Sequence, residues 1–368
     1  MARIVTFGEI MARMAPSGVL RLQQVLPGQL DVTFAGAEAN VAASLAMLNV
    51  DVDFVTALPQ SPLTDGCLAS LRSWRVGTDF IRLKDQGRFG IYFVEMGANQ
   101  RPSRVFYDRE YSAISLAQPD DFDWKAIFAD ASWFHVTGIT PALSKAAAET
   151  TRSAVQEARN CGVSVSCDIN FRSKLWRWDS SRTPLELARS VMREIMPCVD
   201  LFIGNEDDAR LLGIHVDAES DSIIPHGCSS PIPAASRAVA MARAMKRQFP
   251  ALRMVASTFR EQFSASHNNW SGMLLDFATE KLHVAPLKNG TVQPYEMKNI
   301  VDRVGSGDAF DAGILFGLIQ PDCDLQYTIE FATASSCLAH SIVGDCNYAT
   351  QDEIEELIGG SGSGRVVR

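Results

Sequence analysis

A glycine-rich segment at residues 302–313, DRVGSGDAFDAG, has the residue types and spacing best suited to chemistry. Its small residues precede an apolar pattern in which Phe310, Ile314 and Leu318 share one helical face. The amides that open this helix should therefore point outward, where glycine allows close approach and the helix dipole favours negative charge. The segment predicts a site for a phosphate group or for the charge of a phosphoryl-transfer transition state.

Asp308 lies inside this predicted anion site. A carboxylate that faces a bound phosphate is repelled by it, so its presence requires a reason. Asp308 can take the proton from a hydroxyl that attacks phosphorus, or it can be a helix N-cap without a chemical role. The segment lacks the Walker A pattern, and Phe310 occupies the place of the last glycine in the dinucleotide-binding pattern G-x-G-x-x-G.

The elements that must position this segment alternate between strands and helices. We expect strands at 4–7, 52–57, 133–136, 163–168, 201–203 and 254–256, and helices at 37–48, 144–159 and 184–196. Strands separated by helices of this length are typical of βαβ units. The predicted fold class is therefore α/β, with three α/β/α layers around a mostly parallel central sheet.

Two segments, 11–35 and 88–110, interrupt this alternation. They alternate apolar and polar residues, which fits strands with one solvated face outside a doubly covered sheet. They predict a small separate sheet, acting as a lid. Its apolar side chains would lie uncovered in a monomer, so we expect a homodimer or larger homo-oligomer through this sheet. These side chains are Phe89, Ile91, Phe93 and Phe106.

The length of 368 residues allows one large domain or two ordinary ones. The pattern favours one domain at 1–358, a surface insertion at 214–235 and a flexible Gly/Ser-rich tail at 359–368. The net charge of −9 gives little electrostatic support for a nucleic-acid partner. No stretch approaches the ~18 apolar residues that a membrane span needs. The eight cysteines show no zinc spacing, so we expect reduced thiols and a cytoplasmic location.

The D-x-x-G-x-G-D segment at 302–308 resembles the C-terminal signature of the ribokinase-like (PfkB) family of carbohydrate kinases. Residues 34–42, FAGAEANVA, resemble the glycine-rich segment that leads into a helix in the N-terminal half of that family. The resemblance covers roughly residues 4–357. Four further segments are similar to those of family members that phosphorylate 2-keto-3-deoxygluconate: 90–95, 101–109, 168–172 and 344–347.

The resemblance implies a ribokinase-like fold and ATP-dependent phosphorylation of 2-keto-3-deoxygluconate at its C6 hydroxyl, with Mg²⁺. By similarity, Asp308 is the base, and the amides of Gly305, Ser306 and Gly307 form an anion hole. Asp302 would lie near the substrate or support a loop that binds a monovalent cation such as K⁺. A plain turn or cap aspartate is the alternative for Asp302.

The same resemblance implies a pocket for a sugar acid. Gly36 and Asn40 would contact the sugar, with a helix cap as the alternative role of Asn40. The carboxylate of such a substrate needs a cation, and arginine offers it a planar fork. Arg109 suits this role, with Tyr107 on the same strand face and Tyr92 on the paired strand.

On the nucleotide side, the resemblance implies ATP contacts by Asn170, Arg172, Asn205, Gly305, Gly307 and Asn347. Arg172 follows the C-terminal end of a strand, where ligands bind in open α/β sheets, so it would bind either sugar or nucleotide phosphate. The family's N-x-x-E segment has Asp208 in place of Glu, and an indirect magnesium contact through water would absorb the shorter side chain. Residues 257–269 replace a glycine-bearing loop that many relatives place beside the nucleotide.

Three other functions fit parts of the sequence. A kinase of the same fold could act on another sugar acid or on a neutral ketose such as fructose. A non-catalytic sensor of sugar acids or nucleotides could keep the fold without turnover. A nicotinamide-dependent dehydrogenase shares the α/β alternation, but no G-x-G-x-x-G follows the first strand, which disfavours it.

Overall fold

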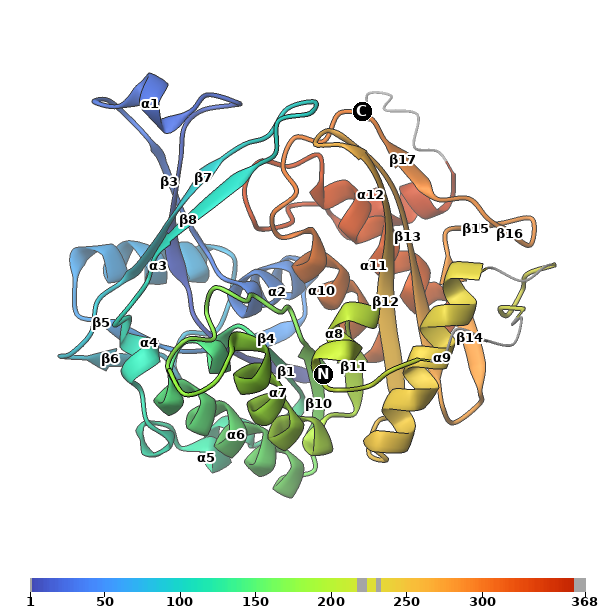
Figure 1. Ribbon diagram of the computed structural model, residues 1–368, viewed down its shortest axis with the longest axis horizontal. Helices are drawn as coiled ribbons and strands as arrows, with labels where there is room; N and C mark the ends of the chain where they lie inside the picture. Colours follow the sequence, from blue (N-terminus) through green and yellow to red (C-terminus); the bar gives the residue numbers. More distant parts are fainter. Residues whose placement is uncertain (1, 217–223, 230–232, 361–368) are drawn as a thin grey trace.

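The computed structural model of the protein describes residues 2–216, 224–229 and 233–360 (Figure 1). Its central sheet has nine strands in the order β14-β13-β12-β11-β10-β9-β1-β4, with β17 paired to β13. The strands are β1 (Arg3–Phe7), β4 (Asp51–Val55), β9 (Ala131–Thr137), β10 (Ser164–Asp168), β11 (Leu201–Ile203), β12 (Met254–Ser264), β13 (His267–Asp276), β14 (Lys281–Ala285) and β17 (Tyr295–Met297). All pairs from β4 to β12 are parallel, and those of β13 are antiparallel. The predicted mostly parallel sheet is confirmed.

Helices cover both faces of this sheet, as the α/β prediction requires (Figure 1). One layer consists of α2 (Ala37–Met47), α3 (Pro62–Ser73), α10 (Ser306–Leu318), α11 (Leu325–Ala339) and α12 (Gln351–Ile358). The other consists of α5 (Trp124–Phe128), α6 (Lys145–Asn160), α7 (Pro184–Ile195), α8 (Glu206–Leu211) and α9 (Pro233–Gln248). Helices α2 and α10, both apolar on nearly every side, pack against each other. Their contact joins the two motif-bearing ends of the chain.

A small four-stranded sheet rises from this body, with α1 (Leu22–Val25) at its far end (Figure 1). Its order is β3-β2-β7-β8, and the strands are β2 (Met11–Ala15), β3 (Asp31–Ala35), β7 (Gly90–Glu95) and β8 (Arg104–Asp108). The inner pair β2/β7 is parallel, and the two outer pairs are antiparallel. The two interrupting segments of the sequence therefore form one separate sheet, as predicted.

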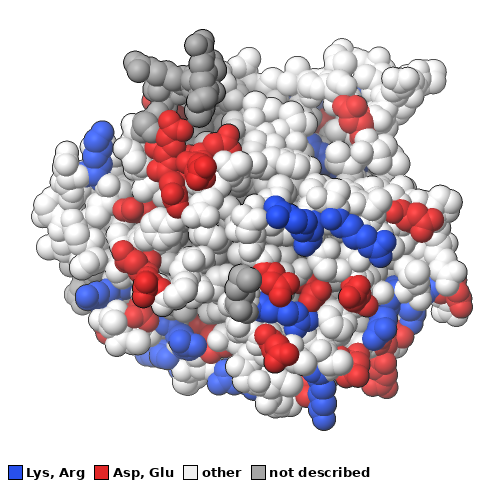
Figure 2. Space-filling model, turned by 180° about the vertical axis from the view of Figure 1, so that it is seen from behind, with Lys and Arg blue, Asp and Glu red and all other residues white. Residues whose placement is uncertain are grey.

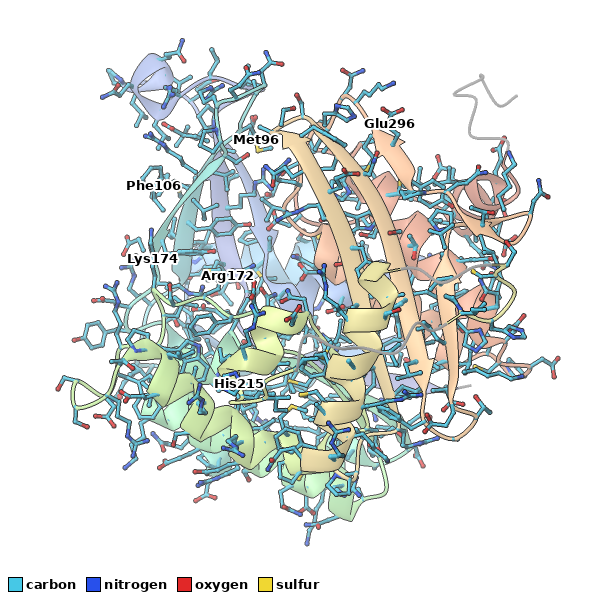
Figure 3. All side chains as sticks on the ribbon, turned by 45° about the vertical axis from the view of Figure 1, so that its right-hand side comes forward. Met96, Phe106, Arg172, Lys174, His215 and Glu296 are labelled. Carbon is cyan, nitrogen blue, oxygen red and sulfur yellow. The ribbon has the colours of Figure 1, made fainter. Side chains whose placement is uncertain are left out.

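Register divides the side chains of the small sheet between its two faces. Val32, Met14, Phe93 and Phe106 lie opposite one another in one row across all four strands. We call this set the outer row; Val32 and Phe106 are about half exposed, and Figure 3 labels Phe106. The prediction that Phe89 belongs to this uncovered face is wrong, because Phe89 is buried against the Phe34 ring. The next row, which contains Arg13, Tyr92 and Tyr107, lies on the opposite face, which is turned toward the body.

The segment 257–269, expected as a loop, is instead the end of a long hairpin. Strand β12 continues to Ser264 and pairs with β13 almost to its tip. The outer half of β12 is largely exposed, so burial alternation could not reveal it in the sequence. The short strands β5 (Ala57–Pro59) and β6 (Arg82–Lys84) form one further pair, and β15 (Leu287–Lys288) and β16 (Thr291–Val292) form another.

The remaining predictions concern the surface and the chain ends. Part of the predicted insertion at 214–235, and residues 361–368 of the predicted tail, lie outside the described residues. No helix in the described ranges combines the length and apolar character that crossing a membrane requires. All eight cysteines are described, and all are free thiols. In Figure 2 basic and acidic side chains are mixed over the lower part of the face, whereas a group of acidic ones lies near the top and a row of basic ones crosses the middle.

Candidate active site

A cavity of about 330 Å³ lies where β10 and β11 end and α10 begins. Its lining includes Asp168, Asn170, Arg172, Asn205, Asp208 and Gly307. Four of the six predicted nucleotide-side residues therefore gather around one space. This is the carboxyl end of the parallel strands, the edge at which open α/β sheets bind ligands.

The glycine-rich loop brings the first amides of α10 to this cavity. Gly305 is the N-cap and has φ +84°, a left-handed conformation that glycine adopts without strain. A Cβ at Gly305 would lie 1.9 Å from the carbonyl oxygen of Asp345, so the backbones there meet directly. A Cβ at Gly307 would meet nothing within 4 Å. Ser306 is buried, and its hydroxyl donates to the carbonyl of Arg303 (3.0 Å).

Asp308 sits in the first turn of α10, and the structure argues against its alternative role as the cap. Gly305 is the N-cap, and no side chain caps this helix. The side-chain partner of Asp308 is Asn40 of α2, whose Nδ2 donates to Oδ2 at 2.6 Å. Oδ1 of Asn40 also accepts a hydrogen bond from the amide of Gly36 (3.2 Å), but the N-cap of α2 is Gly36 itself. Burial raises the pKa of Asp308 to about 7, although the bond from Asn40 lowers it.

Asp302 is bonded to several groups of the protein, and its expected place near the substrate or in a loop that binds a monovalent cation stays a prediction. It is 1% exposed, and its carboxylate accepts the guanidinium of Arg13 at 2.5 Å. The carboxylate also accepts the amides of the two residues that follow it (2.8 and 3.1 Å) and the amide of Gly344 (3.2 Å). The alternative interpretation of Asp302 as a turn aspartate describes these contacts.

The two predicted sugar-side tyrosines lie opposite each other, as expected from the paired strands, but they differ in exposure. Tyr92 is buried and donates to Oδ2 of Asp345 at 2.6 Å, so its hydroxyl already has a partner. Tyr107 is 42% exposed, with its ring centroid 6.0 Å from that of Tyr92. Of the pair, Tyr107 is the one that remains open to a ligand.

Arg109 has a buried acidic partner that the sequence did not indicate. Its Nε donates to Oε2 of Glu9 at 2.7 Å, and its Nη2 contacts the same oxygen. Arg109 follows β8 rather than lying on it, and its guanidinium lies 5.1 Å from the Tyr107 ring centroid. Glu9 keeps its other oxygen, Oε1, buried without a hydrogen-bond partner. The binding of a substrate carboxylate by Arg109 stays a prediction.

Arg172 brings positive charge to a largely acidic cavity. It is exposed, donates to the Phe171 carbonyl (3.3 Å), and is labelled in Figure 3. Burial raises the pKa of Asp168 and of Asp208, while the charge of Arg172 lowers both. Asn170, in a left-handed conformation (φ +41°), donates its amide to Asp168 at 3.1 Å. The carboxylates and the arginine together suit a cation and an anion bound side by side.

Asn205 and Asp208 form the capping box of α8. Oδ1 of Asn205 accepts the amides of Asp207 and Asp208, and Oδ2 of Asp208 accepts the amide of Asn205 at 2.9 Å. The shorter acid thus closes the box that a Glu usually closes. Asn347 is buried, and its amide group is bonded to Ser335 and to the backbone of Ala349. Asn347 was predicted to border adenine, but both polar atoms of its side chain are already bonded within the protein.

Reasoning from the sequence missed three charged residues of this region: Glu9, Arg13 and Asp345. Arg13 and Glu9 carry charge inside or beside a short apolar strand segment, which is the signal that could have marked them. Asp345 lies in the segment 344–347 that was singled out, but no pattern showed its partner.

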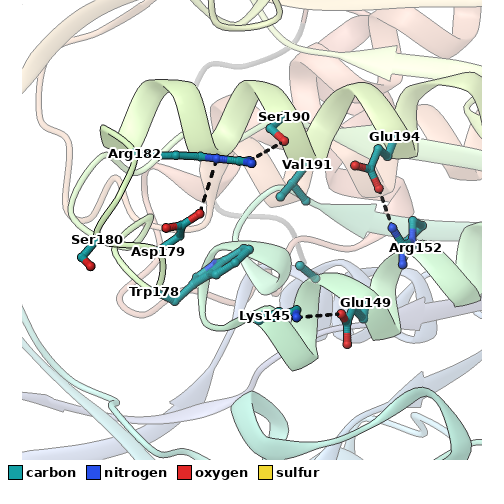
Figure 4. A pocket seen from close by; sticks show the side chains of 11 residues that line it. Lys145, Glu149, Arg152, Trp178, Asp179, Ser180, Arg182, Ser190, Val191 and Glu194 are labelled. Carbon is teal, nitrogen blue, oxygen red and sulfur yellow. Dashed lines mark hydrogen bonds and ion pairs between the residues drawn. The ribbon is translucent and has the colours of Figure 1, made fainter.

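A second hollow, of about 500 Å³, lies between α6 and α7 (Figure 4). Its charged side chains pair with one another: Arg152 with Glu194 (2.5 Å), Lys145 with Glu149 (3.8 Å) and Arg182 with Asp179 (3.4 Å). It lies away from the glycine-rich loop, and its charges already compensate each other, so we assign it no site.

Several known proteins are similar to this chain over most of its length. The profile of the pfkB family of carbohydrate kinases matches residues 1–225. The 2-dehydro-3-deoxygalactonokinase of Haloferax volcanii is 30% identical over 365 residues, covering 99% of this chain and 98% of that one. The crystal structure of 2-dehydro-3-deoxygluconokinase from Thermotoga maritima has a TM-score of 0.85 and 40% identity, covering 98% of this chain and 100% of the other. The fructokinase of Klebsiella pneumoniae is 26% identical over 341 residues, 91% of each chain.

The family profile covers more than half of the chain, and the similarity to the Haloferax enzyme covers nearly all of it. Sequence, fold and the loop before α10 lead to the same assignment: this chain belongs to the PfkB family of carbohydrate kinases.

Proposed function

We propose that the protein transfers the γ-phosphoryl group of ATP to the C6 hydroxyl of 2-keto-3-deoxygluconate. The observation that carries this proposal is the position of Asp308, a buried carboxylate beside the open amides of the glycine-rich loop. Asp308 accepts the proton of the attacking hydroxyl, and Asn40 holds its carboxylate in place. The amides at 305–307 stabilise the charge that develops on the phosphoryl oxygens.

The cavity at the end of β10 and β11 is the proposed nucleotide side. Gly307 and Asn205 line it, and Arg172 offers its charge to a phosphate. The carboxylates of Asp168 and Asp208 provide oxygen ligands of the kind that Mg²⁺ prefers. In the described part of the chain, no group of three or more His, Cys, Asp or Glu could hold a metal ion. Mg²⁺ keeps several waters and depends mainly on phosphates, so we propose that ATP supplies most of its ligands.

The sugar acid would lie between the small sheet and the loop before α10. Tyr107 is exposed on the face of the sheet that turns toward the body, and Arg109 lies directly beside it. Arg172 supplies a second guanidinium for the substrate carboxylate or for phosphate. A cation is required here because the net charge of the chain is −9, so the bulk protein repels an anionic substrate.

A second candidate substrate is 2-keto-3-deoxygalactonate, which differs from the gluconate compound only in the configuration at C4. The favouring observation is the full-length similarity to the Haloferax volcanii enzyme that acts on it. A neutral ketose is the third candidate, because the fructokinase of Klebsiella pneumoniae is also similar over most of the chain. We further propose a cytoplasmic homo-oligomer that covers the outer row of the small sheet.

The test is an ADP-release assay with Mg²⁺-ATP and a panel of 2-keto-3-deoxygluconate, 2-keto-3-deoxygalactonate, gluconate and fructose. We expect the two keto-deoxy acids to give the highest kcat/KM. They carry the carboxylate that fructose lacks and the 2-keto-3-deoxy chain that gluconate lacks, which the names of two similar kinases specify. In Asp308→Asn, turnover of the best substrate should fall by about 10²–10⁴-fold, the usual contribution of a positioned base. Preference for fructose would contradict the sugar-acid proposal, and an unchanged Asp308→Asn would contradict the role of the base.

A further inference from the structure

A buried guanidinium joins the small sheet to the loops of the candidate active site. Arg13 lies on β2 and is 2% exposed. Its Nη2 donates to Oδ2 of Asp302 at 2.5 Å, and its Nη1 contacts Oδ1 of Asp345. One planar group therefore spans two carboxylates that stand in different loops, 289 and 332 residues further along the chain.

The two carboxylates belong to the loops that shape the N-terminus of α10. Asp302 binds the amides of the next two residues, which lead directly into Gly305. The carbonyl oxygen of Asp345 packs against Gly305 so closely that a Cβ would lie 1.9 Å away. Asp302 also accepts the amide of Gly344, which ties the second loop to the first. A shift of either carboxylate would move the amides at 305–307.

Charge balance makes the guanidinium necessary for this arrangement. Asp302 and Asp345 are 1% and 8% exposed, so neither is well solvated by water. Without a cation, two buried carboxylates repel each other, and no interaction offsets the free-energy cost of removing them from water. The fork of Arg13 meets one carboxylate with each terminal nitrogen, a geometry that a lysine ammonium cannot reproduce.

The same cluster includes a second residue of the small sheet. Tyr92 lies beside Arg13 in register across the β2/β7 pair and donates to the other oxygen of Asp345 at 2.6 Å. Tyr107 pairs with Tyr92 on the next strand. The face that would meet the sugar is thus bonded, through Arg13 and Tyr92, to the loop that would meet the phosphate.

We propose that Arg13 is a positioning residue for phosphoryl transfer: it fixes the amides at 305–307 relative to the small sheet, so that hydroxyl and phosphate meet in line. This inference rests on the proposed function, and it adds a residue that neither motif contains. Because the effect falls on the transition state, loss of Arg13 lowers kcat much more than it raises the KM for ATP.

The experiment compares wild type with Arg13→Ala and Arg13→Lys, using the best substrate of the panel. We expect kcat to fall about 10²-fold in Arg13→Ala, as for a displacement of about 1 Å between reacting groups. Addition of about 50 mM guanidinium chloride, far below denaturing concentrations, should raise the kcat of Arg13→Ala at least tenfold. The same concentration of KCl should leave it unchanged. Arg13→Lys, which keeps the charge but loses the fork, should stay low and respond to neither salt.

Arg88→Ala is the matched control, because Arg88 adjoins the same sheet but pairs with Asp108 at the surface. Its kcat should match wild type with and without guanidinium. If Arg13→Ala does not fold, Arg13→Lys decides: wild-type kcat in that folded variant would overturn the proposal. So would a kcat near wild type in Arg13→Ala, or a rescue by KCl equal to that by guanidinium. A wild type without turnover would instead overturn the proposed function.

Discussion

The hydrogen bond from Asn40 affects the pKa of the Asp308 carboxyl group. Burial holds the pKa of Asp308 near 7, and the Asn40 amide pulls it down from a still higher value. A general base must be ionised to work, and it works best when its pKa lies near the operating pH. The contact therefore positions the proposed base and also sets the pH at which it becomes available.

The first prediction at this scale concerns pH. In wild type, kcat/KM should rise through about pH 7, because Asp308 loses its proton there, whereas an ordinary carboxyl group would be fully ionised by about pH 6. In Asn40→Ala the lost donor raises the pKa of Asp308, so the rise should move to higher pH. Rate profiles of the two proteins measure this. An acid limb at the same pH in both would show that Asn40 does not act on Asp308.

Sequence reasoning proposed those residues of the candidate site whose signal lies in local spacing. Gly305, Gly307 and Asp308 were assigned because a small-residue turn and an apolar period stand side by side in the chain. Arg13 and Glu9 were not found, because the partners that give them meaning are distant or have no pattern of their own. The buried partners of Asp302 and Tyr92 could not be predicted for the same reason.

At the scale of the element, the start of α10 depends on two glycines for opposite reasons. Gly305 lies where the backbones of two loops touch and where φ is positive. Gly307 is the second residue of the helix, with open space where a side chain would be, and it lines the cavity. One glycine permits the fold, whereas the other keeps room for a ligand.

Alanine substitution should separate these two roles. Gly305→Ala should lower the free energy of unfolding by more than about 1 kcal/mol, because Ala is strained at φ +84° and its Cβ would overlap the Asp345 carbonyl. Gly307→Ala should stay within about 0.5 kcal/mol of wild type but raise the KM for ATP, because its methyl group enters the cavity. Urea unfolding and ATP titrations measure the pair. Equal losses of stability would contradict the distinction.

The elements themselves were largely predictable where a largely apolar run marks a buried segment and the length of the run separates strand from helix. The expected strand at 201–203 matches β11, a short run that is buried throughout, and the helix expected at 37–48 ends within one residue of α2, a longer run that is buried on nearly every side. The hairpin of β12 and β13 was missed. Its outer half is exposed and held by backbone hydrogen bonds, which leave no mark on side-chain composition.

At the scale of the whole molecule, the outer row of the small sheet is an apolar surface that stays partly exposed in a single chain. Val32, Met14, Phe93 and Phe106 form a continuous apolar row over four strands. The opposite face carries the polar cluster of Arg13, so the sheet cannot hide the outer row by turning over. An identical row on a second copy is the cover that we propose.

The corresponding prediction is that Phe106→Glu yields a single chain in solution, because the association would bury an unpaired charge. The wild type should be at least a dimer by light scattering at micromolar concentration. Leu185→Glu on α7 is the control, since Leu185 is as exposed as Phe106 (44% and 46%) but lies away from the small sheet. A wild type that is already one chain would contradict the predicted association.

The bond from Asn40 to Asp308 also has a consequence for biosynthesis. The two residues are 268 positions apart, and ribosomes add roughly 5–20 residues per second. A nascent chain therefore exposes Asn40 and the future sugar face on the order of tens of seconds before Asp308 has been made. Throughout that interval the chain lacks the proposed phosphate-binding loop and the proposed base, so we expect an unfinished chain to have no kinase activity. The candidate site is therefore complete only after the C-terminal segments have packed against the N-terminal ones.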